Sequence, residues 1–146
     1  MKNWEEILIK PSETLETAIQ VLHTSGMRIV LVVNESRKLL GTVTDGDIRR
    51  ALIKHTPMEC TIKKIMNDSP MTALLSDGSE IIMSKMKNMG LLHIPLVDDK
   101  YTLVGLETLH HLLCKKTYDN PVFIMAGGFG TRLRPLTEKK PKPLLN

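Results

Sequence analysis

The chain has few cysteines and no long apolar stretch. Its 146 residues include two cysteines, Cys60 and Cys114, which lack metal-binding spacing and are too few for a disulfide scaffold. The longest apolar runs, such as residues 29–33, are far too short to span a bilayer, and the N-terminal residues lack the apolar region of a secretion signal. The sequence therefore predicts a cytoplasmic protein with no metal site and no membrane association.

Aromatic residues are also scarce, since one Trp, two Tyr and two Phe make up 3% of the chain. Proteins that bind single-stranded nucleic acid stack bases on aromatic side chains set among basic residues, so this scarcity argues against nucleic acid as a partner. Residues 1–120 hold 15 basic and 15 acidic residues, whereas residues 121–146 hold five basic residues and one acid, which accounts for the net charge of +4. We expect a domain boundary near residue 120.

The segment beyond that boundary carries a distinctive local pattern. An apolar run at 122–125 is typical of a strand buried on both faces, and a glycine-rich loop follows it directly. Because glycine has no Cβ, backbone N–H groups there can close around phosphate oxygens, and Arg132, Arg134 and Lys142 add positive charge beside the loop. A Walker A loop is excluded because no Gly-Lys-Ser/Thr follows, and Gly-Gly-Phe-Gly-Thr-Arg does not match the dinucleotide fingerprint Gly-x-Gly-x-x-Gly.

The run Gly-Gly-Phe-Gly-Thr-Arg-Leu-Arg-Pro-Leu-Thr, followed by Pro-Lys-Pro-Leu, resembles the N-terminal signature of sugar-1-phosphate nucleotidyltransferases, including mannose-1-phosphate guanylyltransferases. In that family the loop and its arginine bind the nucleoside triphosphate (NTP), and the lysine lies at the phosphates. The resemblance assigns NTP binding to Gly127, Gly128, Gly130, Thr131, Arg132 and Lys142. It implies a parent enzyme that makes NDP-sugar and pyrophosphate from NTP and sugar 1-phosphate, with Mg²⁺.

This resemblance covers only 26 of the 146 residues. The family's metal-binding acids and sugar pocket lie further along its fold, so we expect no complete catalytic site in this chain and no transferase activity from it alone. We expect residues 121–146 to be the first strand and glycine loop of a truncated Rossmann-like nucleotidyltransferase domain, after a linker at 117–120.

An internal repeat with an offset of 64 residues organises the first 120 residues. Residues 26–33 align with residues 90–97, and downstream residues 39–41 align with 103–105. Two copies predict halves of one pseudo-symmetric domain, because a solenoid needs at least three repeats. Each copy contains an amphipathic helix closed by a glycine, two strands around a polar turn, and a second helix, so we expect an α/β (α+β) fold with the order β-α-β-β-α in each half.

This order, together with Gly-Thr-Val-Thr-Asp-Gly-Asp at 41–47 and His-Ile-Pro-Leu-Val-Asp at 93–98, resembles a CBS domain pair, or Bateman module. The resemblance places CBS domains at residues 1–60 and 61–116, and it implies clefts that bind AMP, ADP or ATP as effectors and a homodimer. Joined with the first resemblance, it suggests a regulatory pair that acts on its own catalytic domain. The alternative is a structural module that dimerises the same enzyme and binds no ligand.

A ligand cleft can be assigned to residues of the first copy. Thr44 ends a strand and Asp47 starts a helix, which places a hydroxyl and a carboxylate within one turn, where the carboxylate can accept two ribose hydroxyls. Arg28 is a candidate phosphate partner, and Ile9 and Ile29 are candidates to cover a base. Thr and Asp at these positions also serve as helix caps alone, so both interpretations stay open.

The second copy has a weaker version of this cleft. Thr108 matches Thr44, but His111 stands at the position that matches Asp47, and a leucine replaces the arginine at position 28. Both the ribose contact and the phosphate contact are therefore in doubt there. We expect at most one nucleotide per pair, bound in the first cleft.

Overall fold

The computed structural model describes residues 4–114 and 134–135, and the chain divides into two units between Lys115 and Lys116. The expected linker at 117–120 lies outside the described residues. So do all six residues to which the transferase signature assigns NTP binding: Gly127, Gly128, Gly130, Thr131, Arg132 and Lys142. Those assignments stay predictions.

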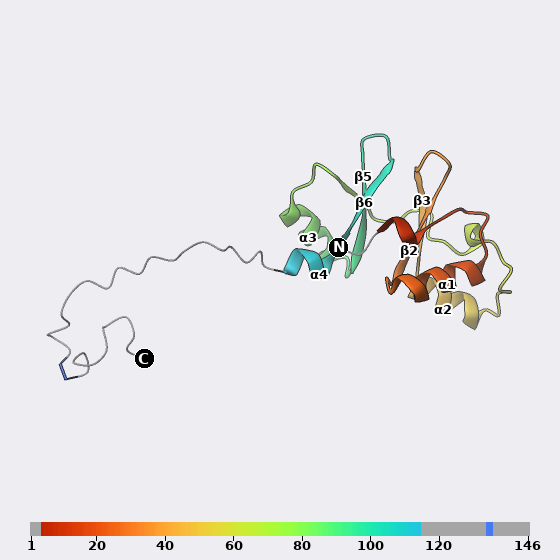
Figure 1. Ribbon diagram of the computed structural model, residues 1–146, viewed down its shortest axis with the longest axis horizontal. Helices are drawn as coiled ribbons and strands as arrows, with labels where there is room; N and C mark the ends of the chain where they lie inside the picture. The colour runs from red at the N-terminus through yellow and green to blue at the C-terminus, as the bar shows by residue number, and fades with distance from the viewer. Residues whose placement is uncertain (1–3, 115–133, 136–146) are drawn as a thin grey trace. The chain divides into compact units, whose positions relative to one another are not determined.

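The first unit is built from two halves with the same order of elements (Figure 1). The first half contains the 3-10 helix η1 (Trp4–Ile7), β1 (Leu8–Ile9), α1 (Leu15–Ser25), β2 (Ile29–Val33), β3 (Leu39–Thr44) and α2 (Asp45–Ile53). The second contains β4 (Ala73–Leu74), α3 (Ser79–Asn88), β5 (His93–Val97), β6 (Leu103–Thr108) and α4 (Leu109–Leu113), and the 3-10 helix η2 (Ile62–Lys64) lies in the connection between the two halves. The predicted β-α-β-β-α order is confirmed in both halves.

Each half has a three-stranded sheet in which the middle strand pairs parallel with the first and antiparallel with the third. Ile29 pairs with Thr44 in the first sheet, and His93 pairs with Thr108 in the second. Both members of the second pair lie 64 positions after those of the first. The strand register therefore confirms the offset found in the sequence.

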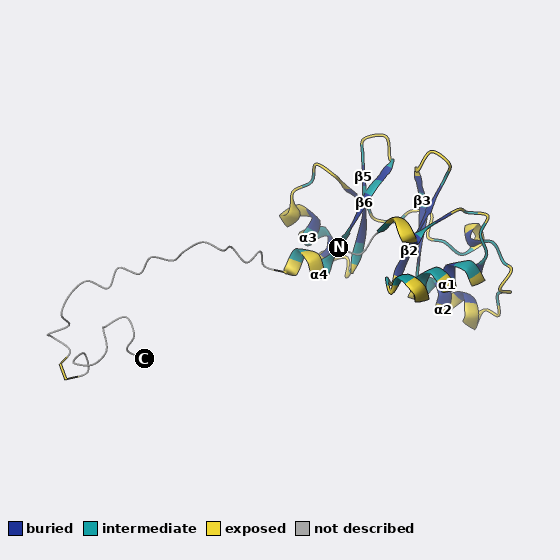
Figure 2. Cartoon of the chain, viewed as in Figure 1, coloured by how far each residue is buried: buried dark blue, intermediate teal, exposed yellow. Residues whose placement is uncertain are grey.

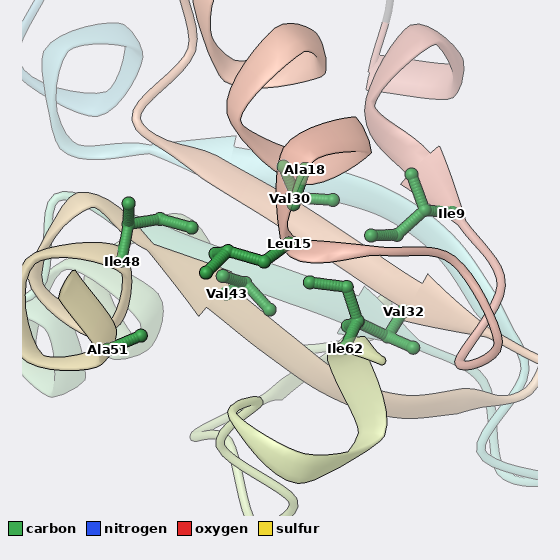
Figure 3. Packing of buried hydrophobic residues seen from close by; sticks show 9 residues of the cluster. All are labelled: Ile9, Leu15, Ala18, Val30, Val32, Val43, Ile48, Ala51 and Ile62. Carbon is green, nitrogen blue, oxygen red and sulfur yellow. The ribbon is translucent and has the colours of Figure 1, made fainter. Parts of the chain in front are cut away.

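Strand β2 is buried on both faces, which explains its unbroken run of branched apolar residues (Figure 2). Alternate residues point to opposite faces. Val30 and Val32 belong to the core of the first half, which Figure 3 shows. That core consists of Ile9, Leu15, Ala18, Val30, Val32, Val43, Ile48, Ala51 and Ile62. The connection at 61–72, hereafter the connector, thus contributes Ile62 to the core of the first half.

The opposite face of β2 joins the two halves. Ile29, Leu31 and Val33 belong to a second buried cluster, which also contains Leu103 and Leu106 from β6. Because this cluster draws on both sheets, neither half covers its own apolar surface completely. The two halves therefore form one packing unit.

The halves also meet through their hairpin turns. Arg37 and Tyr101 occupy equivalent positions of the repeat, and both have left-handed backbone, with φ of 57° and 63°. The N–H of Leu103 donates to the carbonyl of Arg37 at 2.9 Å, and the N–H of Leu39 donates to the carbonyl of Tyr101 at 3.3 Å. A carbonyl group in each turn therefore accepts a hydrogen bond from the first residue of a strand in the other half.

Candidate functional site

The junction of β3 and α2 brings Thr44 and Asp47 together, as expected, and arranges them as a capping box. Thr44 Oγ1 accepts from the backbone N–H of Asp47 at 3.4 Å, while Asp47 Oδ2 accepts from the Thr44 backbone N–H at 2.8 Å and from its hydroxyl at 2.6 Å. These bonds satisfy N–H groups that the first helical turn leaves unpaired, so α2 begins at Asp45, two residues earlier than we expected. Thr44 and Asp47 therefore do cap α2.

A pocket of about 420 Å³ lies beside this cap and is hereafter the Asp47 pocket. Residues from both halves and from the connector line it: Ile29, Thr42, Thr44, Asp47, Arg50, Asn67, Pro70, Met71, Leu91, His93 and Pro95. The lining combines apolar side chains with a few hydroxyl, amide and charged groups, which is typical of small-molecule sites. Three of the five predicted cleft residues, Ile29, Thr44 and Asp47, meet here.

The structure does not bring the other two predicted residues to this pocket. Ile9 is only 6% exposed and packs in the core of the first half. Arg28 lines a separate cavity of about 910 Å³. It stands next to Ile29, just before β2 begins, but does not line the Asp47 pocket. Arg50 is the positively charged side chain that lines the Asp47 pocket in its place.

Asp47 keeps one oxygen that is held only weakly. Its side chain is 12% exposed, and Oδ1 accepts a hydrogen bond from Arg50 Nη2 at 2.5 Å. The Arg50 side chain is 68% exposed, and ion pairs with such an exposed partner contribute roughly 0–1 kcal/mol. Oδ2 can therefore continue to cap α2 while Oδ1 exchanges Arg50 for the hydroxyl groups of a ligand.

Sequence analysis missed four polar residues of the pocket, namely Thr42, Arg50, Asn67 and His93. Helical spacing could have found Arg50, which follows Asp47 by one turn, and the repeat could have found His93, which is the counterpart of Ile29. Asn67 belongs to the connector. It reaches the pocket because its backbone carbonyl and N–H bond to the N–H and carbonyl of Thr42 in β3, at 3.0 and 2.9 Å.

His93 also lines the larger cavity, so it lies between the two sites. Partial burial lowers the pKa of His93 below its ordinary value, and the positive charge of Arg28 lowers it further. The carboxylate of Asp45 opposes this shift as a weaker influence. The neutral form of the imidazole is thus favoured, and it can both donate and accept hydrogen bonds.

The larger cavity contains the equivalent junction of the second half. Thr108 accepts from the backbone N–H of His111 at 3.1 Å and so caps α4. The Nδ1 atom of His111 lies 2.7 Å from Oε1 of Glu107, so the His111 imidazole already has a partner four residues away in the chain. The cap is therefore conserved between the halves, but no carboxylate stands at the position equivalent to Asp47.

Two further surveys concern the described part of the chain. Within it, no three His, Cys, Asp or Glu side chains lie close enough together to hold a metal ion. Within the same residues, every helix is too short or too polar to cross a bilayer.

Comparison with known proteins supports the fold described above. A family model described as CBS domain matches residues 3–54. The solved CBS domain pair of protein MJ0100, in complex with 5′-methylthioadenosine and S-adenosyl-L-methionine, is 27% identical over 71% of this chain and 82% of that chain, with a TM-score of 0.64. Residues 4–114 have the fold of a CBS domain pair. The 64-residue repeat corresponds to the two halves of that fold.

Further comparisons show how much of this chain and of each relative is alike. The CBS domain protein PAE2072 from Pyrobaculum aerophilum, complexed with AMP, shares the fold at 20% identity, with a TM-score of 0.67 and coverage of 80% of this chain and 92% of that one. A protein from Chlamydia muridarum is 35% identical over 109 residues, which are 70% of this chain. The chain spans about a third of the length of the curated relatives it matches. A second family model, nucleotidyl transferase, matches residues 122–146.

Proposed function

We propose that this CBS pair is a regulatory module that binds an adenine nucleotide, AMP, ADP or ATP, in the Asp47 pocket. The observation that carries the proposal is the state of Asp47, whose Oδ1 is held, among the described residues, only by the exposed side chain of Arg50. A carboxylate in this position can accept both hydroxyls of a ribose. The pocket volume of about 420 Å³ falls within the range of small-molecule sites.

The lining suggests how the nucleotide would lie. Ile29, Leu91 and Pro95 provide apolar surface for a base, and the hydroxyl of Thr44 lies beside the ribose position at Asp47. Likeness supports the choice of ligand class, because the MJ0100 pair was solved with adenosine derivatives and PAE2072 with AMP. In the larger cavity His111 stands at the position equivalent to Asp47, and the nearby Glu107 carboxylate is already engaged by Thr108 and His111, so we propose one nucleotide per pair.

A regulatory role follows from the fact that several parts of the chain line the Asp47 pocket. Because both CBS domains and the connector contribute to the pocket, a bound nucleotide stabilises one arrangement of the two halves over others. A catalytic domain that contacts the pair would sense that arrangement, provided its affinity for the pair differs between the two states.

We propose that the regulated enzyme is a sugar-1-phosphate nucleotidyltransferase whose domain starts at residue 121. The match of the nucleotidyl transferase family to residues 122–146 supports this. The parent would use Mg²⁺, would lie in the cytoplasm and would dimerise through its CBS pairs, whereas this chain alone would show no transferase activity.

Calorimetric titration of the whole chain with AMP, ADP, ATP, GTP and S-adenosylmethionine tests the binding proposal. Asp47→Asn keeps a side-chain oxygen for the cap but removes the charge, so we expect nucleotide affinity to fall at least about tenfold. Asp45→Asn is the matched control, because Asp45 lies in the same helical turn and does not line the pocket. Absence of nucleotide binding by the folded wild-type chain, or undiminished binding by Asp47→Asn, would refute the proposal.

A structural dimerisation module is the second candidate, and the exposed faces of two helices favour it. Leu52 and Ile53 of α2 are 43% and 70% exposed, and Ile81 of α3 is 53% exposed. Such apolar surface is typical of an interface. A ligand-free dimer in sedimentation experiments, together with no nucleotide binding, would establish this candidate in place of the first.

A further inference from the structure

A second pocket of about 370 Å³ adjoins the Asp47 pocket and shares Asp47 and Arg50 with it. It is hereafter the basic pocket. Two further basic residues line it, Lys54 at the end of α2 and Lys64 in η2. With Arg50 they give three positive charges against the single negative charge of Asp47, a net charge of +2. The Asp47 pocket thus shares two lining residues with a site whose charge favours anions.

The two lysines are available for a ligand. Both side chains belong to exposed residues, and neither forms an ion pair with another described residue. The carboxyl end of α2 carries partial negative charge, which Lys54 offsets. Thr56 lines the same pocket and offers a hydroxyl donor.

Helix geometry sets these groups in a line that leads away from the ribose position. Asp47, Arg50 and Lys54 are spaced i, i+3 and i+7, so they lie along one face of α2. At 1.5 Å per residue the first and last are about 10.5 Å apart along the helix axis. Lys64 comes from the connector and lines the same pocket from another element. An extended phosphate chain suits this arrangement better than a single phosphate.

We infer that the basic pocket binds the phosphate chain of a nucleoside di- or triphosphate whose ribose is held by Asp47. The inference rests on the proposed function of the Asp47 pocket. When the ribose takes Oδ1 of Asp47, Arg50 is released and contacts the first phosphate, while later phosphates contact Lys54 and Lys64. AMP has no phosphate that reaches the lysines. The module therefore discriminates among adenine nucleotides by the number of phosphates.

Titration of the whole chain with AMP, ADP and ATP, without Mg²⁺ and at low salt, tests the inference. Exposed ion pairs are weak, so we expect roughly threefold in affinity per lysine and about tenfold tighter binding of ATP than of AMP. The double variant Lys54→Gln, Lys64→Gln should bind ATP no more tightly than AMP and keep wild-type affinity for AMP. The double variant Lys63→Gln, Lys87→Gln is the control, because it removes the same charge from residues that line neither pocket.

Inorganic tripolyphosphate, titrated in the same way, separates a nucleotide site from a general polyphosphate site. We expect it to bind at least about tenfold more weakly than ATP, since it makes no ribose contact with Asp47. Binding as tight as that of ATP would overturn the nucleotide assignment. Equal wild-type affinities for AMP and ATP, or equal losses in the two double variants, would overturn the inference and leave the proposed function intact. Failure of every nucleotide to bind would remove the proposed function itself.

Discussion

Replacing Gly41 by alanine tests whether the connector is held rigidly against β3. A Cβ at Gly41 would lie 2.6 Å from the carbonyl oxygen of Asn67 and 2.9 Å from the sulfur of Met66. Asn67 cannot retreat freely, because it exchanges two backbone hydrogen bonds with Thr42. The repeat supplies a matched control at Gly105, where the nearest atom to an added Cβ is a terminal carbon of Leu96, at 3.4 Å.

The two substitutions differ in expected magnitude. Overpacking of this kind costs about 1–3 kcal/mol, so we expect Gly41→Ala to lower the free energy of unfolding by about 2 kcal/mol. For a domain of this size that corresponds to a fall in Tm of about 8 °C. Gly105→Ala meets only ordinary contact and should stay within about 0.5 kcal/mol of wild type. Because Asn67 lines the Asp47 pocket, Gly41→Ala should also weaken nucleotide binding.

Urea denaturation followed by far-ultraviolet circular dichroism, on the whole chain and both variants, measures the difference. Wild-type stability of Gly41→Ala would show that the connector yields easily and would contradict the argument. Equal destabilisation by both variants would assign the effect to loss of a strand glycine, whatever surrounds it.

Three further outcomes are expected. Thr44→Ala should lower the free energy of unfolding by about 1 kcal/mol through loss of the α2 cap, and Thr44→Ser by less, as urea titration would show. Ile62→Ala, at a fully buried position, should cost about 3 kcal/mol, whereas Ile53→Ala, at a side chain that is 70% exposed, should leave the urea midpoint nearly unchanged. Burial, and to a smaller extent the charge of Arg28, lower the pKa of His93 in the folded state. The stability that neutral His93 contributes is therefore fully present above its unfolded pKa of 6.5 and is lost as pH falls through the folded-state pKa. The fall in Tm between pH 7.5 and 5.5 should therefore be smaller for His93→Gln than for wild type or for an exposed His110→Gln control, and equal falls would show that His93 does not cause it.

The fold of the CBS pair could be predicted largely from local signals. The apolar run of β2 and the left-handed Gly26 at the end of α1 mark element boundaries without reference to distant residues. The 64-residue repeat then fixed how the second half copies the first, and the pairing of Ile29 with Thr44 and of His93 with Thr108 follows it.

The site was less predictable because its lining depends on long-range packing. Thr44 and Asp47 were found through spacing within one helical turn, whereas Arg28 and Ile9 were chosen for their charge and apolar character and lie elsewhere. Asn67 has no periodic signal of its own. It reaches the pocket only through its pairing with a strand 25 positions away, at Thr42.

The reciprocal hydrogen bonds between the hairpin turns bear on how such a chain can arise. Arg37 accepts from Leu103, and Tyr101 accepts from Leu39, so each half uses the same surface to contact the other. This is an isologous contact, the kind that two identical subunits make about a two-fold axis. A single repeat therefore has the surface needed to pair with a second copy of itself, and duplication with fusion would convert such a homodimer into this chain. Once the copies are fused, the two junctions can diverge, and in this chain one carries a carboxylate at Asp47 and the other carries His111.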